Sequence, residues 1–120
     1  MADNTRALSR ALTASLSADL LTPEWRRRAT NPLSGHCYVA SEAAWHLLGG
    51  PESGWTPMVT RIGDITHWWL TKGPKVLDIT AGQFAEEVDY SKGRGCGFLT
   101  RAPSKRAAEL IRRVELRLTH

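Results

Sequence analysis

The period of the hydrophobic pattern changes near Trp55, and this change constrains the fold more than any other feature of the chain. Before Trp55, leucines recur at intervals of four residues, which predicts an amphipathic helix over roughly residues 4–21. These leucines are Leu8, Leu12, Leu16 and Leu20. From Trp55 onward apolar and polar residues alternate, which predicts strands over residues 55–62, 66–71 and 75–80.

Three further helices are expected on either side of these strands. Thr22 and Pro23 predict a short helix that ends near residue 28, because threonine caps helices well and proline suits the first helical position. A second helix is expected from residue 36 or 37 to residue 48, ended by Gly49. Ser104 predicts the start of a C-terminal amphipathic helix. Helices followed by a small antiparallel sheet and a final helix indicate an α+β fold.

The length of the chain favours one domain, expected to span residues 1–120. No apolar run approaches the roughly 20 residues that cross a bilayer, and polar residues interrupt the N-terminus too often for a signal peptide. We therefore expect a cytoplasmic protein without a membrane partner. In that compartment Cys37 and Cys96 are expected to stay reduced.

The basic residues are unevenly distributed. The formal net charge is +4, and the excess lies in residues 26–28 and in the last third of the chain. One interpretation is a non-enzymatic binding module that uses the basic C-terminal helix and the glycine-rich segment 91–97 on nucleic acid or an acidic protein. Basic residues on a helix are usually a solvated face, so this is the second interpretation of the sequence.

Three residues in the centre of the chain suggest thiol chemistry. Cys37 stands at the expected start of a helix, His67 in a strand, and Asp78 in the strand that follows. A thiol nucleophile needs a base that takes its proton and a third group that orients the base. The partial positive charge of a helix N-terminus is expected to lower the pKa of Cys37. We therefore expect Cys37 to be the nucleophile, His67 the general base and acid, and Asp78 the orienting carboxylate.

The length of the turn between the last two strands decides whether His67 and Asp78 meet. If the connection around Gly73 holds two or four residues, positions 71 and 76 oppose each other and His67 shares a sheet face with Asp78. Asp78 then lies on the diagonal from His67, about 7 Å away between Cβ atoms, within reach of an imidazole. A three-residue loop without a bulge would reverse the parity.

Each of the three residues has an ordinary structural interpretation as well. A cysteine on a helix that faces a core is usually a small apolar residue, and a strand histidine beside tryptophans is usually a packed ring. An aspartate at the end of a strand often begins a turn. The order and spacing of Cys37, His67 and Asp78 together favour the catalytic interpretation.

The residues around these positions resemble the transglutaminase-like superfamily of papain-like cysteine enzymes. The similarity covers roughly residues 35–80, with Cys37 inside Gly-His-Cys-x-x-x-Ser-Glu-Ala, His67 followed by two tryptophans, and Asp78 followed by Ile-Thr. Ile79 stands where that superfamily commonly has proline. The sequence is also similar to small proteins encoded in bacteriophage genomes.

The resemblance implies a Cys-His-Asp set on a helix that packs against an antiparallel sheet, with no cofactor and no metal. It implies acyl transfer from an amide or peptide through a thioester at Cys37. Water as acceptor gives hydrolysis or deamidation, and an amine gives transamidation. Some members of the superfamily only bind, so a scaffold or an inhibitor is a third interpretation.

Three further residues are candidates for substrate binding. His36 precedes the nucleophile and is placed to donate to an oxyanion or to contact substrate, with an exposed helix-start residue as the alternative. Trp69 is expected to line the site while Trp68 packs in the core. Arg94 is a candidate for a bidentate contact with a substrate carboxylate or phosphate. The chain has no CxxC pair and no His/Cys cluster at ligand spacing, so no metal site is expected at Cys96 or elsewhere.

Overall fold

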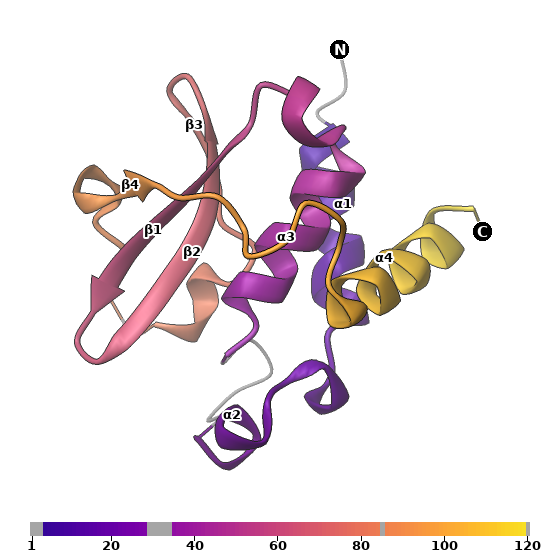
Figure 1. Ribbon diagram of the computed structural model, residues 1–120, viewed down its shortest axis with the longest axis horizontal. Helices are drawn as coiled ribbons and strands as arrows, with labels where there is room; N and C mark the ends of the chain where they lie inside the picture. The colour runs from indigo at the N-terminus through magenta and orange to yellow at the C-terminus, as the bar shows by residue number, and fades with distance from the viewer. Residues whose placement is uncertain (1–3, 29–34, 85, 120) are drawn as a thin grey trace.

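Three helices cover one face of a four-stranded antiparallel sheet (Figure 1). The computed structural model describes residues 4–28, 35–84 and 86–119. The strands are β1 (Thr56–Ile62), β2 (Ile65–Lys72), β3 (Lys75–Leu77) and β4 (Arg94–Gly95), in the order β3-β2-β1-β4. The α+β fold expected from the sequence is confirmed.

The helices are α1 (Asn4–Ser15), α2 (Pro23–Arg28), α3 (Cys37–Leu47) and α4 (Lys105–Leu118). The first helix is shorter than the leucine stripe predicts, and a 3-10 turn over Ala18–Leu20 follows it. The carbonyls at its end bind arginines of α4, since Ala14 O accepts from Arg117 and Ser15 O accepts from Arg113. None of the described helices is both long and apolar enough to cross a bilayer.

The core lies where α1, α3 and α4 pack against one another and against the sheet. Small side chains on α3 allow a close approach, because Ala40, Ala43 and Ala44 are fully buried. Apolar residues from α1, α4, β2 and the end of β3 fill the space around them. The larger members are Leu8, Leu12, Leu70, Leu77, Leu110 and Val114.

A buried carboxylate joins α3 to the start of α4. Glu42 is fully buried, and its two oxygens accept hydrogen bonds from the backbone N–H and the hydroxyl of Ser104, both at 2.8 Å. The Ser104 hydroxyl in turn accepts from the N–H of Ala107 at 3.2 Å, which confirms the expected N-cap. Glu42 therefore fixes the entry of the chain into α4.

The hairpin between β2 and β3 has the parity that the sequence argument requires. Its connection holds two residues, with Gly73 at a φ of 58°, and Thr71 pairs with Val76. β3 ends at Leu77 and is shorter than the strand expected over residues 75–80, so Asp78 follows the strand. Because β3 pairs only with residues 70–72 of β2, the first half of that strand edge has no strand partner there, and the thiol of Cys37 bonds to it at Thr66.

The glycine-rich segment 91–97 contributes a short edge strand. A 3-10 turn over Tyr90–Lys92 leads into β4, which pairs with Met58 and Val59 of β1. Gly93 allows this close approach, because a Cβ atom there would lie 2.3 Å from the ring of Trp69. The missing side chain therefore lets the segment close over the sheet face that carries Trp69.

Candidate active site

Cys37 is the first residue of α3, and its thiol lies against the backbone of β2. The thiol donates a hydrogen bond to the carbonyl of Thr66 at 3.4 Å, and the N–H of Trp68 interacts with the sulfur. In an antiparallel ladder the backbone groups of alternate residues point to the same side, so Thr66 and Trp68 present theirs together. The thiol therefore contacts the backbone of the residues immediately before and after His67.

His67 and Asp78 form a buried hydrogen-bonded pair. Nε2 of His67 lies 2.7 Å from Oδ2 of Asp78, and the two side chains are 0% and 3% exposed. An ionised carboxylate only accepts hydrogen bonds, so we assign the imidazole proton to Nε2. The other ring nitrogen, Nδ1, is then left with its lone pair. It is buried and has no hydrogen-bond partner among the described residues.

Tyr90 completes the surroundings of Asp78. Its hydroxyl donates to Oδ2 of Asp78 at 2.9 Å, so this oxygen accepts from both Tyr90 and His67. Burial and this hydrogen bond raise the pKa of Tyr90 above its ordinary range. The His67 ring is also stacked on Trp69 at 5.7 Å between centroids and meets the edge of Phe84 at 4.8 Å.

Neither Tyr90 nor Phe84 is among the residues singled out from the sequence. Both lie in the irregular connection between β3 and β4, where no hydrophobic period shows which side chains return to the sheet. The one local signal is Gly93, which follows Tyr90 closely and marks a point where the backbone approaches the sheet.

The pKa of Cys37 is raised to about 11, which is opposite to the expected lowering. Burial is the largest cause, and the negative charge of Asp78 adds to it. The N–H of Trp68 in β2 lowers the pKa, and the N–H groups of Tyr38 and Cys37 at the helix start lower it as expected, but burial outweighs them. The resting site therefore holds a neutral thiol. No hydrogen bond joins Cys37 to His67 among the described residues.

The three expected substrate-binding residues occupy different environments. His36 is 2% exposed and lies 3.0 Å from the carbonyl of Ser17 through Nε2, so it joins α3 to the chain after α1. Trp69 is fully buried, and its ring is stacked on that of His67. Arg94 is exposed on β4, two strands away from β2. The structure therefore brings Trp69 to the histidine but leaves Arg94 away from the site.

A pocket of about 270 Å³ lies beside Cys37. Cys37 and Thr66 are among its lining residues, so the pocket borders the point where the thiol meets the backbone of β2. Its walls include Trp25 of α2, Tyr38 of α3 and Trp68 of β2. Of the two neighbouring tryptophans of β2, Trp68, on the helix-facing side of the sheet, therefore lines this pocket, and Trp69 is not among its lining residues.

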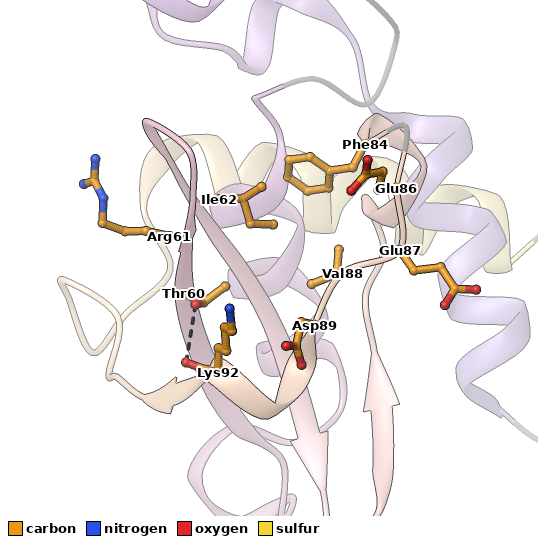
Figure 2. A pocket seen from close by; sticks show the side chains of 9 residues that line it. All are labelled: Thr60, Arg61, Ile62, Phe84, Glu86, Glu87, Val88, Asp89 and Lys92. Atoms are coloured by element: carbon orange, nitrogen blue, oxygen red, sulfur yellow. Dashed lines mark hydrogen bonds between the residues drawn. The ribbon is translucent and has the colours of Figure 1, made fainter.

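A second pocket, of about 510 Å³, lies on the opposite sheet face (Figure 2). Ile62, Phe84 and Val88 supply its apolar part, and the edge of Phe84 also meets His67. Three carboxylates belong to its lining: Glu86, Glu87 and Asp89. In Figure 2 the side chain of Arg61 points away from this hollow.

Neither cysteine is in a disulfide, and Cys96 is half-buried near the start of the segment that leads to α4. Among residues 4–28, 35–84 and 86–119, no group of three or more histidine, cysteine or carboxylate side chains is placed to hold a metal ion.

The basic side chains of α4 are largely engaged within the protein. Arg113 pairs with Asp19 and Glu109, and Arg117 bonds to Ser15 and Ala14. Arg112 also pairs with Glu109. These contacts reduce the free basic surface on which the binding-module interpretation depends.

A comparison with protein families matches residues 4–118 to the model described as YunG protein. That description names no activity. Neither a search of curated proteins nor a search of solved structures returned a match.

Proposed function

The chain belongs to the YunG family, and we propose that it is a thiol-dependent enzyme that transfers an acyl group from an amide or peptide. Cys37 is the nucleophile, His67 the general base and acid, and Asp78 the carboxylate that orients the imidazole. The products are those of hydrolysis or deamidation when water is the acceptor, and of transamidation when an amine is the acceptor.

The observation that carries this proposal is the buried pair of His67 and Asp78. Burying a carboxylate and an imidazole costs free energy, and one oxygen of this carboxylate, Oδ1, lacks a partner among the described residues. The pair holds the proton on Nε2 and so leaves Nδ1 as a base. A merely packed histidine needs neither a buried carboxylate nor a ring nitrogen that is left without a hydrogen-bond partner among the described residues.

The reaction begins when the thiol turns from the carbonyl of Thr66 toward Nδ1 of His67. Sγ of Cys37 then attacks the amide carbonyl while Nδ1 takes the thiol proton, and Asp78 stabilises the imidazolium that forms. The N–H groups of Cys37 and Tyr38, which lower the pKa of the thiol, receive the developing oxyanion. The C–N bond breaks as His67 returns the proton to the departing amine, which leaves a thioester on Cys37.

The second half of the reaction releases the acyl group. Water or an amine loses a proton to Nδ1 of His67 and attacks the thioester carbonyl, and the thiol leaves with the proton restored. The raised pKa of Cys37 fits this general-base route, in which the thiol loses its proton only as the new bond forms.

The test uses a substrate that reports any acyl transfer, p-nitrophenyl acetate, followed by release of p-nitrophenolate and by the mass of the intact protein. We expect an acetyl adduct on Cys37 and turnover that is lost in Cys37→Ala. Cys96→Ala is the matched control. It should keep both the acetyl adduct on Cys37 and the turnover, because Cys96 lies outside this site. Turnover that survives in Cys37→Ala refutes the proposal.

A further inference from the structure

The pocket beside Cys37 has apolar walls. Trp25, Tyr38 and Trp68 contribute aromatic surface, and Leu99 stands at its rim with 90% of its surface exposed. An exposed leucine beside three aromatic residues is a surface that an apolar ligand group covers favourably. The volume, about 270 Å³, is suited to one side-chain-sized group.

The charge of this pocket is one-sided. Among the described residues that line it, Arg106 is the one charged residue and none is acidic. The guanidinium bonds to the carbonyl of Leu20 at 3.3 Å, and Arg106 takes no part in the ion pairs that the described residues form. By contrast, the pocket in Figure 2 carries Glu86, Glu87 and Asp89. A guanidinium that forms no ion pair within the described part of the chain, and that borders an apolar wall, favours a carboxylate as partner.

We infer that this pocket binds the acyl group of the substrate and selects one that combines an aromatic or branched apolar group with a carboxylate. The apolar group packs between Trp25, Trp68 and Leu99, and the carboxylate binds Arg106. The thiol of Cys37, which lines the same pocket, then faces the carbonyl that it attacks. This inference rests on the proposed function, because it assigns the substrate class of the same cysteine.

The test compares three probes that alkylate thiols: N-chloroacetyl-phenylalanine, N-chloroacetyl-phenethylamine and N-chloroacetyl-glycine. In each case the thiolate forms a C–S bond, the C–Cl bond breaks and chloride leaves. The first probe carries the aromatic ring and the carboxylate, the second only the ring, and the third only the carboxylate. The readout is the ratio of labelling at Cys37 to labelling at Cys96, measured by peptide mass spectrometry.

We expect the phenylalanine probe to give a labelling ratio about tenfold higher than the probe without the carboxylate or the probe without the ring. A charge-assisted hydrogen bond and a buried ring each strengthen binding by about tenfold. Arg106→Gln should reduce this ratio to that of the phenethylamine probe. Lys105→Gln is the matched control, because Lys105 is the exposed neighbour of Arg106 and does not line the pocket. Equal ratios for the three probes, or an unchanged ratio in Arg106→Gln, overturn the inference.

A second pair of variants keeps the test decisive if Arg106→Gln does not fold. Leu99→Asp places a negative charge at the rim and should weaken labelling by the phenylalanine probe, while Leu99→Asn should weaken it less. Both substitutions are at an exposed residue, so the fold tolerates them. Identical ratios in the two variants overturn the inference. Equal probe ratios together with loss of ester turnover in Cys37→Ala refute only the pocket assignment, whereas turnover in Cys37→Ala refutes the proposed function itself.

Discussion

Nε2 of His67 and Oδ2 of Asp78 lie 2.7 Å apart with both side chains buried. The hydrogen bond fixes the tautomer of the imidazole, because the carboxylate accepts the Nε2 proton and leaves Nδ1 basic. The ring itself is fixed from two sides by Trp69 and Phe84. A base with a defined tautomer and a fixed ring plane is what general-base catalysis requires.

Asp78→Asn is expected to reduce kcat for ester turnover by on the order of 10²–10⁴, because an asparagine amide stabilises the imidazolium less and permits the wrong tautomer. The fold should persist, since asparagine has nearly the same shape and retains hydrogen-bonding groups for His67 and Tyr90. The measurement is kcat for p-nitrophenyl acetate alongside the melting temperature. Asp89→Asn is the control, because Asp89 is exposed and bonds to Ser91. An unchanged kcat in Asp78→Asn would exclude Asp78 from the proposed site.

Tyr90→Phe removes one of the two donors to Oδ2 of Asp78. We propose Tyr90 as a positioning residue, since it contacts the carboxylate rather than the reacting atoms. A hydrogen bond of this kind contributes about 0.5–1.5 kcal/mol, so kcat should fall about three- to tenfold with KM unchanged. Ser91→Ala, a change at the next residue that affects only the Asp89 contact, should leave kcat unchanged. A fall in melting temperature without any change in kcat would assign Tyr90 a structural role alone.

The pairing of His67 with Asp78 was predictable from the sequence, because it depends on local rules. The alternation along β2 and a two-residue turn at Gly73 are enough to place both residues on one face. The start of α3 at Cys37 and the cap at Ser104 follow from equally local signals. The α+β fold follows from the order of these elements.

The features that were not predictable depend on contacts between distant segments. The end of α1 is set by Arg113 and Arg117, about a hundred residues later in the chain. Tyr90 reaches Asp78 from an irregular connection that has no hydrophobic period. The pKa of Cys37 is decided by tertiary burial, which outweighs the local effect of the helix start.

Glu42→Ala is expected to destabilise the fold strongly, because it leaves the backbone N–H and hydroxyl of Ser104 without their acceptor at the start of α4. Lost hydrogen bonds to a charged group and the cavity in a fully buried position together predict a loss of about 2–4 kcal/mol in the free energy of unfolding. Urea denaturation measures this loss. Glu115→Ala, at an exposed position of α4, should change stability by less than about 0.5 kcal/mol. Equal stability of the two variants would show that Glu42 does not hold α4 in place.

The raised pKa of Cys37 makes stability depend on pH in the alkaline range. The folded state holds the thiol proton more tightly than the unfolded chain, in which a thiol titrates near 8.5. The resulting stabilisation is complete below about pH 8.5 and is lost as the pH rises toward about 11. Between pH 8 and pH 10.5 the wild type should therefore lose about 2 kcal/mol more of its unfolding free energy than Cys37→Ala does.

Cys96→Ala should keep the wild-type pH dependence, because it leaves the buried thiol in place. The same thiol gives a kinetic readout, since iodoacetamide reacts with the thiolate and its rate at Cys37 should still be rising at pH 9. Parallel stability curves for the wild type and Cys37→Ala would show that burial does not raise this pKa. A different result would be an alkylation rate at Cys37 that reaches its plateau well below pH 8.5 and that falls when His67 is replaced. The site would then operate with a preformed thiolate instead of general-base activation.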